Sequence, residues 1–214
     1  MVINKLDSIT FRLCELHDFT WLKKYGTAFH VIDETDSGCV CIGMRNGDKR
    51  YFCKIAGVNT LEADVTPQES VRILKEAVRL YEDLAHPNLI RLIEAYEYQD
   101  FFVAVFAWAD GECLFDHWNF EKYRKDVALK SSKQRFFELP IERKSASAET
   151  VFSFLQHVNE KGYVAVDFYD GSIMYDFVEH KTMLCDIDFL RKQPVVNDMG
   201  EAWFGTKRLK APEE

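Results

Sequence analysis

The sequence contains no hydrophobic run of the roughly 18 to 20 residues that a membrane-spanning helix requires. Its longest apolar stretch, residues 101–109, has only the length of a buried strand. The opening MVINKLDSITFR lacks the apolar core of a secretory signal peptide, so we expect a cytoplasmic protein with no membrane partner. Internal repeats and low-complexity linkers are also missing. The 214 residues are therefore expected to form one sizeable core or two small lobes.

An excess of positive charge is missing as well. The chain has 27 lysines and arginines against 35 aspartates and glutamates, which gives a net charge of −8 and a pI near 5.3. A protein that binds nucleic acid by neutralising phosphates needs the opposite balance. The composition therefore predicts no nucleic-acid partner.

Cysteine pairs at metal-binding or redox spacing are absent. The six cysteines are scattered, none belongs to a C-x-x-C pair, and the six histidines show no metal-ligand spacing. We interpret the thiols as small buried apolar groups in a reducing compartment, rather than as a disulfide framework or a zinc site.

The first half of the chain predicts five strands and one helix. Residues 1–30 are mixed and aromatic, and we expect them to form an ordered extension that packs on the strands after it. The helix begins at the capping box TPQE, at residues 66–69, and ends before His86-Pro87-Asn88. The strands are expected at residues 29–33, 39–44, 50–57, 89–97 and 100–109, with a hairpin signal at Asn46-Gly47. Together these elements predict an antiparallel sheet covered by one helix.

The second half changes character. Residues 118–146 are charged and irregular, so a loop or a short helix is expected there. Ser147 is a candidate cap for a helix that stops at Gly162. Short hydrophobic runs at residues 163–166, 172–177 and 182–187 are typical of hairpins, and the last 25 residues are expected to be loop.

Three charged residues interrupt these apolar runs. Asp167 lies in VAVDFYDGS and Asp186 in CDID, and an unpaired charge is costly to bury. Such aspartates either cap turns or hold a metal or accept a proton. Lys54 interrupts RYFCKIAG, where alternation places Cys53 and Ile55 on one side and Lys54 on the other. Taken alone, Lys54 indicates the exposed face of an edge strand.

The order of these features resembles the protein kinase family over residues 31–214. The segment LAHPNLI, at residues 84–90, is similar to the family's L-x-H-P-N-I. The segment GTKRLKAPE, at residues 205–213, is similar to the Ser/Thr-kinase ending G-T-x-x-Y-x-A-P-E and is the most specific match. The resemblance implies an α+β, protein kinase-like two-lobe fold with a five-stranded N-lobe. Residues 31–109 would form that lobe and the hinge, with residues 1–30 packed on it, and residues 110–214 a partial, mainly helical C-lobe truncated after A-P-E.

The resemblance also implies roles for individual polar residues in ATP- and Mg²⁺-dependent phosphoryl transfer. Lys54 would contact the α- and β-phosphates of ATP. Asp186 would hold Mg²⁺, and Ser172 would offer an oxygen to a second metal ion. Asp167 would orient the substrate hydroxyl and accept its proton.

Further residues would bind the nucleotide if the resemblance holds. Gly38 and Val40 fall on the end of the Gly-rich loop. Phe106 falls on the gatekeeper position, and the backbone of Ala107 and Ala109 would face the adenine. Glu76 is a candidate partner of Lys54, although the spacing to His86 falls on Ala77 instead. The alternative for Glu76 is a solvated glutamate on the helix surface.

Several positions depart from the family pattern. The Gly-rich loop reads DETDSGCV at residues 33–40, with three carboxylates and one glycine. Ala165-Val166 replaces His-Arg before Asp167, Tyr169 replaces a lysine, and Asp186-Ile187-Asp188 replaces D-F-G. Three functions therefore remain open. The chain is a Ser/Thr protein kinase, a pseudokinase that acts as a binding or regulatory module, or a kinase-like phosphotransferase for a small molecule.

Overall fold

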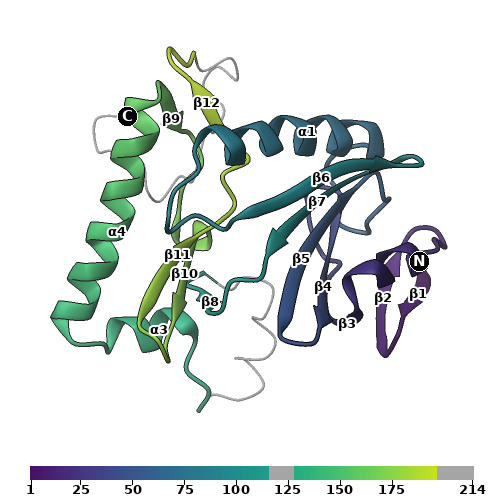
Figure 1. The fold of residues 1–214 in the computed structure, drawn as a ribbon, viewed down its shortest axis with the longest axis horizontal. Coiled ribbons are helices and arrows are strands. Elements are labelled where there is room, and N and C mark those ends of the chain that lie inside the picture. The colour runs from purple at the N-terminus through teal and green to yellow at the C-terminus, as the bar shows by residue number, and fades with distance from the viewer. Residues whose placement is uncertain (116–127, 197–214) are drawn as a thin grey trace. The chain divides into compact units, whose positions relative to one another are not determined.

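The computed structural model describes residues 1–115 and 128–196, and the chain divides into two compact units (Figure 1). The N-terminal unit comprises Met1–Glu82 and Arg91–Trp108. The C-terminal unit comprises Asp83–Ile90 and the chain from Ala109 onward. Within the described ranges, no helix is both long and apolar enough to cross a membrane.

A five-stranded antiparallel sheet organises the N-terminal unit, as the sequence predicts. Its strands lie in the order β3 (Thr27–Ile32), β4 (Cys39–Asn46), β5 (Lys49–Ala56), β7 (Phe101–Ala107) and β6 (Leu92–Tyr98). The turn between β4 and β5 contains Gly47 at a φ of 58°, which favours glycine. Because β5 lies third of five, residues on it have a neighbouring strand on each side.

Helix α1 (Pro67–Asp83) packs on one face of this sheet. Its start is fixed by the predicted capping box, in which the Thr66 N–H donates to the Glu69 carboxylate at 2.9 Å. The Ser70 hydroxyl accepts the Gly57 N–H at 2.9 Å and so ties the helix to the end of β5. Further along the helix, the ring centroids of Tyr81 and of Phe106 on β7 lie 4.8 Å apart. These contacts bury the apolar stripe of the helix.

The N-terminal residues cover the opposite face of the sheet. They form the hairpin β1 (Val2–Leu6) and β2 (Ile9–Leu13), followed by the 3-10 helix η1 (Thr20–Tyr25). The side chains of Leu13, Phe19 and Leu22 share one apolar core with β4, β5 and β7. The hairpin was not apparent in the sequence because a polar residue, Asn4, occupies a buried position. Its amide donates to the Glu15 carbonyl at 2.9 Å.

The C-terminal unit combines helices with small sheets. Its elements are β8 (Glu112–Cys113), α3 (Ser132–Phe137), α4 (Ile141–Glu160), β9 (Tyr163–Ala165), η3 (Asp170–Ser172), β10 (Ile173–Asp176), β11 (Lys181–Leu184) and β12 (Leu190–Lys192). The strands form one sheet in the order β11-β10-β8 and a second from β12 and β9. The described part of this unit thus contains the helices that the resemblance implied, together with more β-structure than a mainly helical lobe would have.

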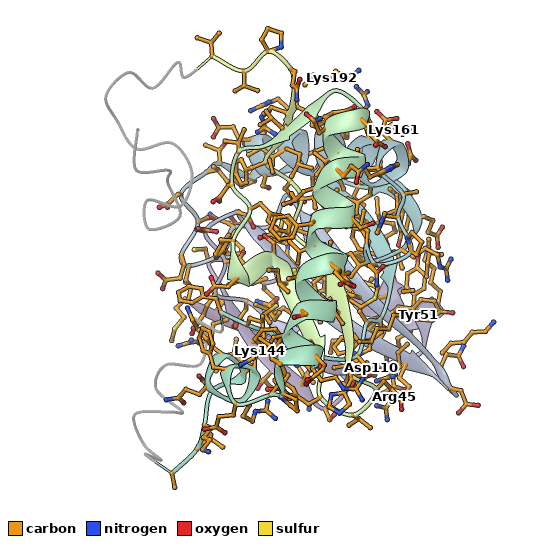
Figure 2. All side chains as sticks on the ribbon, turned by 90° about the vertical axis from the view of Figure 1, so that its left-hand side faces the viewer. Arg45, Tyr51, Asp110, Lys144, Lys161 and Lys192 are labelled. Atoms are coloured by element: carbon orange, nitrogen blue, oxygen red, sulfur yellow. The ribbon has the colours of Figure 1, made fainter. Side chains whose placement is uncertain are left out.

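Helix α4 begins six residues before its predicted cap. Pro140 precedes the first turn at a φ of −53°, which suits a helix start. Ser147 lies inside the helix instead and is buried, and its hydroxyl accepts a hydrogen bond from the Thr182 hydroxyl at 2.9 Å. Figure 2 shows Lys144 near one end of α4 and Lys161 at the other. Strand β12 also falls where the sequence predicted only loop.

Candidate functional site

Lys54 lies on the central strand of the five-stranded sheet. Its cross-strand neighbours are Cys41 on β4 and Ala104 on β7, and its side chain is half-buried. The interpretation of Lys54 as a residue on an edge strand is therefore wrong, because β5 is paired on both sides. The two residues directly opposite Lys54 on the neighbouring strands are small. The pairing of Cys41 and Ala104 with Lys54 could not be read from the sequence without the register.

Val40 does not share this face. It pairs with Ile55 on β5, it is fully buried, and it belongs to the core that contains the N-terminal hairpin. Since side chains alternate along a strand, Val40 and Lys54 point to opposite sides of the sheet. The register therefore argues against a contact of Val40 and Lys54 with the same nucleotide, which stays a prediction. Cys41, one residue later, occupies the position on the Lys54 face.

Phe106 lies on the same face as Lys54. It follows Ala104 by two residues on β7, is 1% exposed, and meets Phe52 at 6.3 Å between ring centroids. The ring of Tyr81 on α1 also contacts the Phe106 ring, in a T-shaped arrangement. The backbone N–H of Ala107 donates to the Arg91 carbonyl at 2.9 Å, so this donor is already used within the sheet.

The predicted phosphate loop is bonded to its own unit. The Thr35 hydroxyl donates to the Cys39 carbonyl and accepts the Cys39 N–H, which closes the loop. The Asp36 carbonyl accepts the Asp64 N–H at 2.9 Å. Gly38 has a φ of 67°, and a Cβ there would lie 3.2 Å from the Cβ of Ser70. Glycine is therefore favoured at this position, both by the positive φ and by the close packing against the start of α1.

Two of the three acidic residues in this loop contact Arg12 of β2. The Arg12 backbone N–H donates to the Asp33 carboxylate at 2.6 Å, and its guanidinium forms an ion pair with Glu34. The pair is about half exposed, so its contribution to stability is small. It does, however, direct these carboxylates toward the N-terminal hairpin. The negative charge of the loop is therefore partly compensated.

Glu76 is exposed on the surface of α1. Its carboxylate forms an ion pair with Arg72, one turn earlier, at 2.9 Å, and 54% of its side chain is exposed. Ala77 is the residue that faces inward, with no exposed surface. The geometry favours the alternative of a solvated glutamate over a partner for Lys54.

In the C-terminal unit, Asp167 and Asp186 each follow a strand by two residues. Asp167 comes after β9 and is half-buried, whereas Asp186 comes after β11 and is exposed. Asp186 has a φ of 52°, a left-handed conformation that aspartate tolerates and that recurs at functional sites. Ala109, the other predicted backbone contact, opens this unit in a half-buried coil.

Ser172 lies beside the strand end that carries Asp186. The Ser172 carbonyl accepts the Cys185 N–H at 2.9 Å, and its own N–H donates to the Tyr169 carbonyl at 2.9 Å. The side chain is fully buried, yet its hydroxyl has no hydrogen-bond partner within the described residues. A buried hydroxyl in this state can still coordinate a ligand.

The oxygen atoms of Asp186 and Ser172 are the hard ligands that Mg²⁺ prefers. Within the described ranges, no three histidine, cysteine, aspartate or glutamate side chains form a metal-binding group. Mg²⁺ does not require one, because it is usually bound by one or two carboxylates together with substrate phosphates. The oxygen chemistry of the two side chains therefore suits this ion.

One charged contact of this region was missed in the sequence. The Lys133 ammonium of α3 lies 2.9 Å from the Asp170 carboxylate of η3, which is 18% exposed. The two residues are 37 positions apart, and Lys133 belongs to the charged segment expected to be irregular. No local spacing signals this pair.

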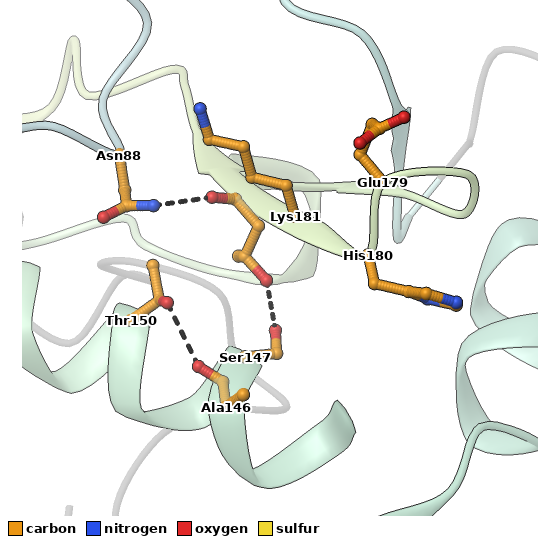
Figure 3. A pocket seen from close by; sticks show the side chains of 8 residues that line it. Asn88, Ala146, Ser147, Thr150, Glu179, His180 and Lys181 are labelled. Carbon is orange, nitrogen blue, oxygen red and sulfur yellow. Dashed lines mark hydrogen bonds between the residues drawn. The ribbon is translucent and has the colours of Figure 1, made fainter. Parts of the chain in front are cut away.

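A cavity of about 360 Å³ lies elsewhere in the C-terminal unit (Figure 3). It is lined by α4 and the turn between β10 and β11, at the end of the hairpin opposite Ser172 and Asp186. Polar groups of its lining form hydrogen bonds with one another. The Asn88 amide donates to the Thr182 carbonyl at 3.0 Å, and the Thr182 hydroxyl donates to the Ser147 hydroxyl. The cavity contains none of the predicted site residues.

No protein-family model matches the chain, and no curated protein matches its sequence. What the structure establishes is the class, an α+β protein whose largest described sheet has five antiparallel strands. The function must be inferred from the side chains themselves.

Proposed function

We propose that the protein is a kinase-like phosphotransferase, which moves the γ-phosphoryl group of ATP to a hydroxyl group, most simply that of a protein serine or threonine. The observation that carries the proposal is the buried Ser172 hydroxyl, which has no partner among the described residues and lies beside the strand end before Asp186. Burying such a group without a hydrogen bond costs stability, and we take a bound ligand to be its missing partner.

In the proposed reaction, each polar residue of the site has one role. The oxygen of the acceptor hydroxyl attacks the γ-phosphorus, and the bond from that phosphorus to the β–γ bridging oxygen breaks, which releases ADP. The Asp167 carboxylate accepts the hydroxyl proton and passes it to solvent. Lys54 binds the α- and β-phosphates. Asp186 and Ser172 would hold Mg²⁺, which supplies neutralisation of charge on the phosphate oxygens.

A second candidate is a pseudokinase that acts as a binding or regulatory module. One observation favours it: the loop at residues 33–38 is hydrogen-bonded to its own unit. This bonding would weaken phosphate binding while leaving the fold intact. A small-molecule acceptor is the third candidate, since Asp188 adds a second carboxylate after Asp186.

The first experiment measures thermal stability with ATP, in the presence and absence of Mg²⁺. Nucleotide at about 100 times its Kd should stabilise the protein by about 2.7 kcal/mol, and Mg²⁺ should enlarge the shift. If ATP binds, radiolabelled phosphate transfer to a generic basic protein and to small hydroxyl compounds separates the three candidates. Asp167→Asn should abolish transfer and keep the ATP shift. The absence of any shift would refute the ATP-dependent proposal.

A further inference from the structure

The ion pair between Lys133 and Asp170 adjoins the residues to which we assign chemistry. Asp170 follows Asp167 by three residues and precedes Ser172 by two. Its carboxylate is largely buried, at 18% exposure, whereas the Lys133 side chain is 41% exposed. The pair therefore connects a largely buried carboxylate to the ammonium group of a residue on α3. The carboxylate belongs to the segment between β9 and β10 that carries Asp167, which we call the Asp167 loop.

Helix α3 is firmly attached at the place where it presents Lys133. Its capping box is complete, with the Ser131 hydroxyl accepting the Gln134 N–H and the Gln134 side chain accepting the Ser131 N–H. The hydroxyl of Ser132 donates to the Cys113 carbonyl of β8. The Arg135 guanidinium forms an ion pair with Glu112 and lies 4.1 Å from the ring centroid of Phe177. A helix of six residues is not stable alone, so these contacts define the position of Lys133.

The loop itself cannot supply a cation. Residues 163–176, from β9 to the end of β10, contain no lysine, arginine or histidine. Phosphoryl transfer places negative charge on the transferred group and relies on nearby cations to stabilise it. Lys133 is a cation that the fold brings to this loop from a distant part of the chain.

We propose that Lys133 is a catalytic residue, which Asp170 holds beside the Asp167 loop and which exchanges Asp170 for the transferred phosphoryl group during the reaction. The inference rests on the proposed function. The Lys133 side chain is 41% exposed, so its ammonium group can turn toward a second partner, whereas the Asp170 carboxylate, at 18% exposure, stays in place to receive it again. The flexible four-carbon stem of lysine allows the ammonium group to move between two partners.

The test compares three variants of the full chain: Lys133→Met, Lys133→Arg and the control Lys130→Met. Lys130 also forms an exposed ion pair in this segment, but its partner is Glu138, at 2.7 Å, and not Asp170. The measurements are kcat and KM for ATP with a basic protein substrate, and the thermal shift caused by ATP and Mg²⁺.

We expect Lys133→Met to lower kcat about a hundredfold while KM and the nucleotide shift stay the same. Lys133→Arg should restore much of kcat, because it keeps the charge, and Lys130→Met should stay within about twofold of the original protein. If Lys133 had only a structural role, Lys133→Met would instead lower the melting temperature, and Lys133→Arg would not selectively restore kcat.

Three other outcomes would each refute either the role of Lys133 or the proposed function. If the original protein transfers phosphate and Lys133→Met does so equally well, the role of Lys133 is refuted and the proposed function stands. If Lys133→Met loses the nucleotide shift or melts early, and arginine fails to rescue kcat, the pair is only a structural clamp. If the original protein binds ATP but transfers phosphate to no acceptor, the proposed function is wrong and the role of Lys133 falls with it.

Discussion

A hydroxyl that is buried without a hydrogen bond destabilises a folded protein, and Ser172 carries such a group within the described part of the chain. Its backbone is well bonded on both sides, to Tyr169 and to Cys185, so the residue is held firmly in place. An alanine would satisfy the same backbone bonds without the unpaired oxygen. Under the proposed function, the serine is retained for the ligand that its hydroxyl would bind.

This contrast leads to a prediction for Ser172→Ala. The variant should gain about 1 kcal/mol of unfolding free energy in the absence of ligand, because the cost of the unpaired hydroxyl disappears. Its stabilisation by ATP should lose part of the component that depends on Mg²⁺, because Asp186 remains. Urea denaturation measures the first effect and thermal shift the second.

Ser147→Ala is the matched control for that measurement. Ser147 is also buried in the C-terminal unit, but its hydroxyl is bonded to Thr182 at 2.9 Å. Its removal leaves the Thr182 hydroxyl without that acceptor and should cost about 1 kcal/mol. If Ser172→Ala were destabilised to the same degree, the Ser172 hydroxyl would have an ordinary structural partner and the metal-ligand proposal would lose its main support.

The sequence indicated some of the site residues for a physical reason. Lys54, Asp167 and Asp186 interrupt apolar runs, and such interruptions are visible in one dimension. The placement of Val40 on the face opposite Lys54 could not be predicted, because the face to which a side chain points depends on strand register. Lys133 was not identified at all, since it joins the loop only through the packing of α3 on β8.

At the scale of elements, the N-terminal hairpin and η1 act as the second cover of the five-stranded sheet. Apolar side chains of β4, β5 and β7 point to both faces of the sheet, so each face must be covered by another layer. Helix α1 covers one face, and the N-terminal residues supply the other layer of the core. The ring of Phe19 stacks on Phe101 at 6.2 Å and is 1% exposed.

Phe19→Ala is therefore expected to destabilise the protein by about 3–5 kcal/mol, since a large side chain is lost from a close-packed core. Urea denaturation followed by tryptophan fluorescence is a suitable measurement, because Trp21 lies in the same aromatic cluster, 6.5 Å from Phe101. The control is Phe152→Ala on α4, where the ring is 69% exposed and the expected change is within about 0.5 kcal/mol. Equal effects of the two substitutions would show that the N-terminal residues do not contribute to the core.

The sequence predicted most elements and misplaced a few boundaries. The five strands and α1 were predicted because alternation, the capping box and the hairpin turn all act over short distances. The β1–β2 hairpin was missed because Asn4 is buried by hydrogen bonds that no local pattern reveals. The start of α4 was misplaced because Ser147, a favoured cap residue, is bonded to β11 instead.

At the scale of the whole molecule, all six cysteines remain thiols, as the sequence predicts, and Cys39, Cys41 and Cys53 are buried. Burial raises the pKa of the Cys53 thiol to about 12, so this group stays protonated and behaves as a small apolar side chain. The fold therefore depends on packing rather than on covalent links. Its sensitivity to conditions must come from groups that change charge near neutrality.

His86 is such a group. Burial, followed by the nearby His157, lowers the pKa of His86 below its ordinary value of 6.5. Its ring packs 5.6 Å from Phe154 and 5.8 Å from His157, and its Nδ1 accepts the Asn88 N–H at 3.2 Å. Protonation at Nδ1 would remove that acceptor. The folded state thus favours neutral His86.

We predict that stability falls as the pH is lowered through and below about 6.5, because the unfolded chain then binds a proton that folded His86 resists. The stabilising contribution is complete above pH 6.5 and is lost as the pH approaches the lowered pKa of the folded state. Urea midpoints measured between neutral and mildly acidic pH should show this slope. His86→Gln should flatten it, and His157→Gln should flatten it partly, since only the smaller cause of the shift is removed. An unchanged slope in His86→Gln would assign the acid sensitivity to other groups.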